Sequence, residues 1–223
     1  LTCSKTYQDW QVCFHTHSKV VDINRDAKKV NTAKGESFEY DKLILATGSF
    51  AFVPPIPGKD RDHCLVYRTI NDLHAIKKSA QGSKVGVVIG GGLLGLEAAN
   101  ALKQLGLQTH VIEFAPQLMG VQIDGAGGRL LKNKITVRGV TVHTSVATEQ
   151  IIEGENSRYK MCFKGGQTLD TDMIVFSAGI RPYDNLAREF NLEIGERGGI
   201  VINNHCQTSD KNIYAIGECA LWN

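Results

Sequence analysis

The chain has 223 residues, of which 42% are hydrophobic, and its 25 basic and 23 acidic residues give a net charge of +2. This composition excludes a disordered chain, and the absence of any run of five or six like charges argues against a nucleic-acid or anionic-membrane partner. No stretch approaches the roughly 20 apolar residues that span a bilayer, and no signal peptide is present at the start, so a cytoplasmic protein with small or soluble partners is expected.

The first third of the chain combines a meander, a strand and a helix. Residues 20–40 alternate and turn, which predicts a small antiparallel meander, and the apolar run 42–46 predicts a strand. Helical spacing covers 70–78, and the small and polar residues at 79–83 predict a linker to the next strand.

The remainder predicts a parallel sheet. Residues 85–89, 93–105 and 109–113 form one strand, helix and strand unit. A second meander is expected at 140–169 and a last buried strand at 173–177. The predicted fold class is therefore α/β, a doubly wound sheet decorated with antiparallel β-meanders.

Neither cysteine nor histidine spacing predicts a metal site. The six cysteines are far apart and form no CxxC pair, so most are interpreted as buried thiols in a reducing compartment. They are Cys3, Cys13, Cys64, Cys162, Cys206 and Cys219. His15 and His17 alternate on a predicted strand, but no third ligand is near them in sequence.

The strongest motif is GGGLLG at residues 90–95, a GxGxxG that leaves a predicted strand and opens a predicted helix. Gly90 allows the tight turn, Gly92 lets backbone approach a diphosphate, and Gly95 lets helix and strand pack closely. The helix N-terminus adds free N–H groups and a partial positive charge. The residues expected to contact a dinucleotide here are Gly90, Gly92, Leu93, Leu94 and Gly95.

An acidic residue at the end of the next strand completes the motif. Glu113 follows Gly90 by twenty-three residues, where its carboxylate can accept hydrogen bonds from the adenine-side ribose. A carboxylate there repels a 2′-phosphate, and residues 114–119 contain no Lys or Arg that would bind one. The motif predicts NADH rather than NADPH.

Three further segments, 40–49, 177–182 and 208–218, each end an apolar strand in a glycine, which lets backbone pass close to a cofactor. In this order around the GxGxxG, they resemble the two-dinucleotide-domain flavoproteins that include ferredoxin, rubredoxin and disulfide reductases. Within that family the chain is most similar to the large subunits of NADH-dependent nitrite reductases. The similarity is carried by residues 66–73, 90–99, 110–116, 198–203 and 213–222.

The resemblance implies an NAD-binding Rossmann-type domain at 83–195, inserted in a truncated FAD-binding domain of the glutathione-reductase type at 1–82 and 196–223. Nothing before Val20 matches the second GxGxxG with which the family begins, so a fragment with an incomplete FAD site is expected. The resemblance also implies siroheme and a [4Fe–4S] cluster in a missing C-terminal part. It allows a homodimer.

The resemblance assigns roles to individual positions. For FAD, it implies a backbone contact to adenine at Val20, a turn passing the flavin at Thr47 and Gly48, and a phosphate contact at Arg68. Gly217 and Glu218 match the segment that contacts the ribityl and diphosphate groups, where the wider family usually has Asp. On the nicotinamide side the implied residues are Glu97, with Ala178 and Gly179 in the turn after the last strand, and Arg181 is a candidate for the same cleft. No side chain is expected to act as a catalytic acid or base.

Three functions fit these observations. The first is the part of a nitrite reductase large subunit that passes electrons from NADH through FAD to the iron–sulfur and siroheme centres. The second is an NADH-dependent ferredoxin or rubredoxin reductase, whose electron acceptor is a separate protein. The third is a non-catalytic module that binds NAD without turnover.

Overall fold

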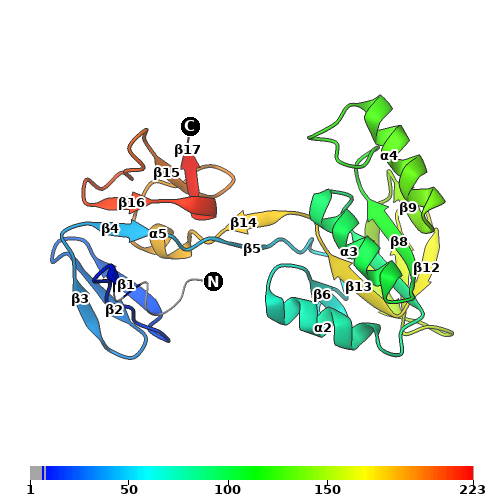
Figure 1. The fold of residues 1–223 in the computed structure, drawn as a ribbon, viewed down its shortest axis with the longest axis horizontal. Coiled ribbons are helices and arrows are strands. Elements are labelled where there is room, and N and C mark those ends of the chain that lie inside the picture. The colour runs from blue at the N-terminus through cyan, green and yellow to red at the C-terminus, as the bar shows by residue number, and fades with distance from the viewer. Residues whose placement is uncertain (1–6, 8, 223) are drawn as a thin grey trace. The chain divides into compact units, whose positions relative to one another are not determined.

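The computed structural model describes residue 7 and residues 9–222. Contacts divide the chain into two compact units, Leu1–Ser49 with Pro182–Asn223 (unit 1) and Phe50–Arg181 (unit 2). Figure 1 shows the elements of both units along the chain. This division differs from the predicted domain boundaries at 82/83 and 195/196, for reasons that follow from the packing of each unit.

Unit 2 is built on a five-stranded parallel sheet with the order β6-β13-β7-β8-β9. Its strands are β6 (Cys64–Val66), β7 (Val85–Ile89), β8 (Gln108–Glu113), β9 (Val140–Thr144) and β13 (Met173–Phe176). Every pairing in the sheet is parallel. Because β6 pairs with β13, residues 50–82 belong to this unit rather than to unit 1.

Three helices pack on one face of the sheet: α2 (Ile70–Ala80), α3 (Leu93–Gln104) and α4 (Gly125–Val137). Their apolar residues form one core with Val88 and Val175. The residues directly before these two valines point to the opposite face of the sheet, because side chains alternate along a strand. Val87 and Ile174 accordingly belong to a second core.

That opposite face is covered by an antiparallel sheet of β10 (Thr148–Glu153), β11 (Tyr159–Phe163) and β12 (Thr168–Thr171). Met161 and Phe163 from this sheet pack against the parallel strands. A parallel sheet covered on both faces explains why its strands are continuous apolar runs. The predicted α/β fold class is confirmed.

Unit 1 consists of small sheets around one apolar core. β1 (Val20–Asn24), β2 (Lys29–Thr32) and β3 (Ser37–Glu39) form the predicted antiparallel meander. β4 (Leu43–Leu45) pairs in parallel with β16 (Ile213–Ala215).

The rest of unit 1 follows residue 182. β15 (Ile200–Ile202) pairs in parallel with β17 (Ala220–Trp222). The short helices are α5 (Asn185–Glu189) and η1 (Gly217–Cys219). Ala187 of α5 is buried in the core of unit 1, so residues 182–195 pack with unit 1 and not with unit 2. β5 (Ser49–Ala51) and β14 (Ile180–Pro182) form a two-stranded sheet at the two places where the chain passes from one unit to the other.

Two structural predictions were wrong, and one helix was missed. Residues 140–144, predicted as part of a meander, are the parallel edge strand β9, and the meander itself begins at Thr148. Helix α4 was not predicted, because three glycines in its first turn lower the helix propensity, but the Asp124 side chain accepts a hydrogen bond from the Gly127 N–H and caps it. The predicted linker begins too early, since Ser79 and Ala80 are buried in the last turn of α2.

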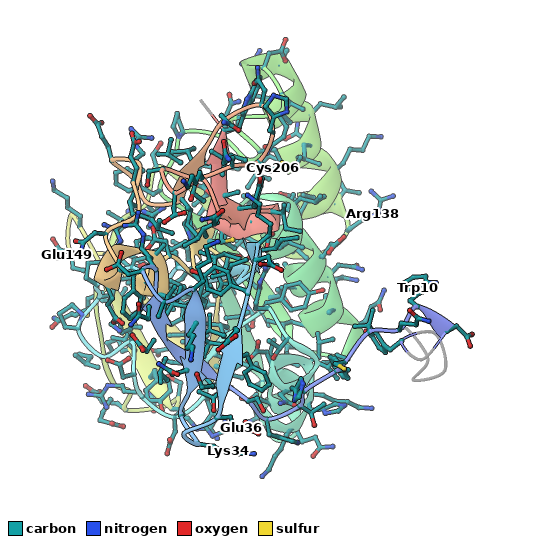
Figure 2. The ribbon with its side chains drawn as sticks, turned by 90° about the vertical axis from the view of Figure 1, so that its left-hand side faces the viewer. Trp10, Lys34, Glu36, Arg138, Glu149 and Cys206 are labelled. Atoms are coloured by element: carbon teal, nitrogen blue, oxygen red, sulfur yellow. The ribbon has the colours of Figure 1, made fainter. Side chains whose placement is uncertain are left out.

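The histidine and cysteine interpretations also need correction. His15 and His17 lie outside any strand, and His17 has a positive φ of 55°. Of the described cysteines, Cys219 is buried, Cys64 and Cys162 are half-buried, and Cys13 and Cys206 are exposed. Figure 2 labels Cys206 among the side chains drawn. Cys3 lies outside the described residues.

Candidate functional site

Two of the three motif glycines in unit 2 are required by the packing of the protein itself. Gly90 has a φ of +119°, and a Cβ there would lie 2.2 Å from the Ser177 carbonyl oxygen. A Cβ on Gly95 would lie 2.0 Å from the Gly90 carbonyl oxygen. Any side chain at either position would therefore force the β7 turn, the N-terminus of α3 and the end of β13 apart.

Gly92 differs from these two glycines because nothing in unit 2 occupies the space beside it. It is the N-cap of α3 and has an extended backbone conformation. A Cβ at this position would have no atom within 4 Å apart from those of its chain neighbours. The first backbone hydrogen bond of the helix runs from Leu96 to Gly92, which leaves the N–H groups of Leu93, Leu94 and Gly95 without a partner inside the helix. This N-terminus carries no side-chain cap, and its open N–H groups can bind a phosphate.

The Glu113 side chain lies beside the same turn and is held there by two hydrogen bonds. One carboxylate oxygen accepts a hydrogen bond from the Gly91 N–H at 2.6 Å, and the other accepts one from the Ala115 N–H at 2.7 Å. Each oxygen keeps further capacity to accept hydrogen bonds. An acceptor-only group fixed beside open N–H donors suits a molecule that presents hydroxyl groups next to phosphates, so the residues fit the adenosine diphosphate portion of a dinucleotide.

The ends of β7, β8 and β13 surround a cavity of about 620 Å³ in unit 2. The structure brings five of the predicted residues together in its wall: Gly90, Gly92, Glu113, Ala178 and Gly179. This cavity is of the size that holds small ligands. Its position at the carboxyl ends of parallel strands is the usual ligand position in open α/β sheets.

The same cavity is lined by residues that the sequence analysis did not select. They are Phe114, three residues of the β9–β10 connection (Val146, Ala147 and Thr148), and the segment that contains Pro54, Pro55 and Ile56. Phe114 could have been found as the neighbour of Glu113, but the other segments are far away in sequence and carry no motif.

A smaller cavity of about 200 Å³ also lies at the α3 N-terminus. Arg68 lines it together with Leu93, Leu94 and Gly179. Gly92 and Gly179 line both cavities, so the glycine turn separates them. Arg68 is thus a residue of unit 2, and it lines the same cavity as the first two residues of α3.

The two remaining predicted residues of unit 2 lie outside these walls. Glu97 is an exposed residue of α3 and lines neither cavity. The Arg181 guanidinium lies over the Phe52 ring, 4.4 Å from its centroid, in a cation–π contact.

Unit 1 holds the other predicted positions. Val20 and Thr47 line a cavity of about 570 Å³ together with Tyr183. The Thr47 hydroxyl donates a hydrogen bond to the Tyr183 carbonyl at 2.6 Å, and the Gly48 carbonyl accepts one from the Tyr183 N–H at 2.9 Å. The turn after β4 is thereby fixed against the start of the second unit 1 segment.

The turn after β16 is built in a similar way. Gly217 begins η1 with a φ of +74°, a conformation that favours glycine. Glu218 is exposed, and its carboxylate accepts a hydrogen bond from the Ser49 hydroxyl at 2.9 Å. Both glycine turns of unit 1 thus lie at the carboxyl ends of the paired strands β4 and β16.

The described residues contain no group of three His, Cys, Asp or Glu side chains that could hold a metal ion. Among the helices that the structure describes, none has the length and apolar character needed to cross a membrane.

Comparison with known proteins adds relatives that cover most of the chain. The sequence profile of the family described as pyridine nucleotide-disulphide oxidoreductase matches residues 4–223. The nitrite reductase [NAD(P)H] large subunit of Klebsiella oxytoca is 58% identical over 203 residues, which cover 91% of this chain and 21% of the relative. The nitrite reductase (NADH) large subunit of Escherichia coli (strain K12) is 56% identical, covering 92% of this chain and 24% of the relative. The chain thus spans about a fifth to a quarter of these relatives.

Solved structures share the fold. A ferredoxin reductase from Rhodopseudomonas palustris superimposes with a TM-score of 0.93 at 28% identity, covering 100% of this chain and 54% of that one. An NAD-dependent persulfide reductase from A. fulgidus gives a TM-score of 0.91 at 29% identity, covering 99% of this chain and 41% of that one.

Proposed function

Because the chain belongs to the pyridine nucleotide-disulphide oxidoreductase family, we propose that it binds NADH and FAD and forms the NADH-oxidising part of a nitrite reductase large subunit. The observation that carries the proposal is the Glu113 carboxylate, fixed by two backbone N–H groups beside the uncapped N-terminus of α3. The identities of 58% and 56% to nitrite reductase large subunits favour this branch of the family.

In this proposal the glycine turn of unit 2 holds the dinucleotide. The N–H groups of Leu93, Leu94 and Gly95 bind the diphosphate, which reaches them because Gly92 has no side chain. Glu113 accepts hydrogen bonds from the ribose hydroxyls. Gly90 shapes the turn, and Ala178 and Gly179 leave room in the cavity wall for the nicotinamide portion. Glu97, which the family resemblance assigns to the carboxamide, lies outside both cavity walls, so the cavity gives that assignment no support.

FAD contacts are proposed for the remaining positions. In unit 1 these are Val20 in the cavity wall, the turn of Thr47 and Gly48, and the turn of Gly217 and Glu218. Arg68 would supply a cation for a phosphate. FAD held by these residues would supply a hydride acceptor for NADH and a donor of single electrons. The residues of the chain bind and orient both cofactors, and none of them needs to act as an acid or a base.

For the nitrite reductase reading, the proposed electron acceptors are a [4Fe–4S] cluster and siroheme of the complete protein. Among the described residues, the cysteines form no group that could ligate such a cluster. The close structural match to a ferredoxin reductase favours a second candidate, in which a separate protein accepts the electrons. Assays of the complete protein that contains this chain distinguish the two: NADH-dependent consumption of nitrite supports the first, and reduction of added ferredoxin without nitrite consumption supports the second.

Nucleotide choice tests the proposed site directly. The negative charge of Glu113 should make NADH bind more tightly than NADPH, because the carboxylate repels a 2′-phosphate. Isothermal titration calorimetry of the chain with each nucleotide measures the ratio of the two affinities. Glu113→Gln should bring this ratio closer to one. Asp170→Asn is the matched control, since Asp170 is an exposed acid of β12 outside the cavity wall, and it should leave both affinities unchanged. Tighter binding of NADPH by the unmodified chain, or no heat from NADH, contradicts the proposal.

A further inference from the structure

The wall of the 620 Å³ cavity includes residues that directly follow Glu113 and residues that follow β9. The chain after β9 returns beside the chain after β8: the Val146 N–H donates to the Glu113 carbonyl at 3.1 Å, and the Ser145 N–H donates to the Ala115 carbonyl at 3.0 Å. Val146 and Ala147 therefore form an apolar wall next to Phe114, and all three residues line the cavity.

The Phe114 side chain takes no part in the apolar packing of unit 2. It is 79% exposed, and it belongs to none of the apolar cores. Among the described residues, its ring has no stacking or cation–π contact. The hydration of an exposed phenylalanine ring is unfavourable, so a ligand that covers the ring gains binding free energy.

The chemical order of a dinucleotide places one group at this position. The diphosphate lies at the N-terminus of α3, and the adenine-side ribose lies at Glu113, so the base must extend beyond Glu113. Phe114 directly follows Glu113, and the apolar wall of Val146 and Ala147 lies beside it. Adenine has two flat aromatic faces that stack well on phenylalanine.

We propose that Phe114 is the stacking platform for the adenine ring and sets the selectivity of the cavity for adenosine nucleotides, an inference that rests on the proposed NADH site. The platform acts together with Glu113: the acid orients the ribose, and the ring holds the base against the β9–β10 connection. Phe114 lies between Glu113 and Ala115, which are joined by a hydrogen bond from the Ala115 N–H to the Glu113 carboxylate. The backbone that carries the Phe114 ring is therefore fixed as well.

The test is calorimetry of NADH and of ADP with Phe114→Ala and Phe114→Tyr. Removing the ring should weaken both ligands by the same factor, on the order of tenfold, because both carry the adenosine portion. Phe114→Tyr keeps the stacking surface and should bind both ligands as the unmodified chain does. Folding is not at risk in either variant, since the side chain is largely exposed, and circular dichroism checks this.

Val121→Ala is the matched control, because Val121 is an apolar residue of the same loop, 95% exposed and outside the cavity wall. It should leave both affinities unchanged. The inference is overturned if Phe114→Ala binds NADH as tightly as the unmodified chain, if NADH weakens while ADP does not, or if ADP does not bind. No binding of NADH to the unmodified chain is a different result, which rejects the proposed function itself.

Discussion

Unit 2 packs apolar side chains on both faces of one parallel sheet, whereas unit 1 ties small sheets together with polar side chains that bond to backbone. In unit 2 the residues Val87 and Val88 alternate between two continuous cores. In unit 1 the buried carboxylate of Asp184 accepts hydrogen bonds from the Gly199 N–H at 2.7 Å and from the Arg188 guanidinium at 2.9 and 3.1 Å. The turn before β15 is therefore held to α5 by a charged group in addition to the packing of Ala187 and Ile200 in the core.

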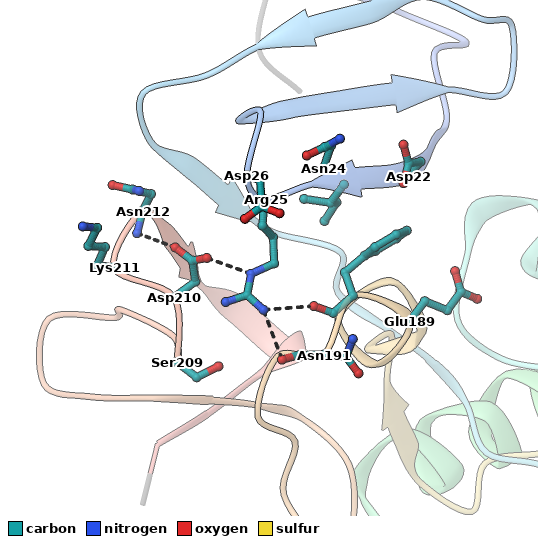
Figure 3. Close-up of a pocket in the computed structure, with 12 residues that line it drawn as sticks. Asp22, Asn24, Arg25, Asp26, Glu189, Asn191, Ser209, Asp210, Lys211 and Asn212 are labelled. Carbon is teal, nitrogen blue, oxygen red and sulfur yellow. Dashed lines mark hydrogen bonds and ion pairs between the residues drawn. The ribbon is translucent and has the colours of Figure 1, made fainter.

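A second polar brace in unit 1 joins three segments through Arg25 (Figure 3). Its guanidinium donates to the Asp210 carboxylate at 2.8 Å and to the carbonyls of Phe190 and Asn191 at 3.3 and 3.4 Å. Burial raises the pKa of Asp210, but the Asn212 N–H and the Arg25 guanidinium outweigh this and lower it overall. Unit 2 thus combines two apolar cores with local polar contacts, such as those of the Asp172 carboxylate to the N–H groups of Lys84 and Val85, whereas unit 1 adds polar braces to a single core. The predictions below test both units.

The largest effect is expected at a glycine of unit 2. Gly95→Ala should lower the free energy of unfolding by about 3 kcal/mol, because its Cβ would lie 2.0 Å from the Gly90 carbonyl and the backbone has to move. Urea unfolding followed by circular dichroism measures this loss. A loss below about 1 kcal/mol would show that the turn adjusts easily, and shape would not be what limits unit 2.

Gly92→Ser in the same motif should separate stability from binding. Serine is a favourable N-cap and meets no atom at this position, so the free energy of unfolding should stay within about 0.5 kcal/mol of its original value. The serine side chain occupies the approach to the helix N–H groups, so the affinity for NADH should fall at least about tenfold. The same affinity in the variant as in the unmodified chain would place the diphosphate elsewhere.

The corresponding change in unit 1 is Asp184→Asn, with an expected loss of about 2 kcal/mol. The amide replaces a buried carboxylate that accepts from Gly199 and Arg188, and one of its two ends becomes a donor facing other donors. Unfolding in urea at neutral pH measures the loss. The ion pair between Asp60 and Lys59 is at the surface and serves as a comparison. Asp60→Asn should change the free energy of unfolding by less than about 0.5 kcal/mol.

The same contrast explains what the sequence could predict. The strand 85–89, the helix from residue 93 and the glycine motif with Glu113 follow from local patterns, because covered parallel strands are apolar runs and GxGxxG combines three separate steric requirements. Helix α4 depends on the Asp124 cap and on packing of Leu131 and Ile135, which overcome its glycines. The wall at Val146 to Thr148 depends on hydrogen bonds to residues about thirty positions earlier, and no local pattern encodes such a contact.

A histidine pair predicts how unit 2 responds to pH. The His110 Nδ1 and His143 Nε2 atoms lie 3.1 Å apart, which requires one ring to accept a hydrogen bond and so to be neutral. Burial, and then the neighbouring His143, lower the pKa of His110, and burial, and then Lys132, lower the pKa of His143. Because both pKa values in the folded chain lie below the ordinary 6.5, their contribution to stability is present above pH 6.5 and is lost as the pH falls through the folded values.

The melting temperature should therefore fall by a few degrees as the pH drops from neutral toward 5, and His143→Gln should reduce this dependence. Differential scanning fluorimetry across a pH series measures both curves. His74→Asn removes an exposed histidine of α2 and should leave the curve unchanged. An equally steep curve in His143→Gln would assign the pH response to other groups.

The smallest effect is a gain in stability at the cavity wall. The Thr148 hydroxyl is buried without a hydrogen-bond partner among the described residues, so Thr148→Val should raise the free energy of unfolding by about 1 kcal/mol and the melting temperature by about 2 to 4 °C. Thr171→Val is the matched control, because the Thr171 hydroxyl lies 3.2 and 3.0 Å from the carbonyls of Val85 and Met173, and its loss should destabilise by a similar amount. If both variants destabilise, Thr148 has a partner, such as a bound water, and unit 2 also uses a polar brace where it lines the cavity.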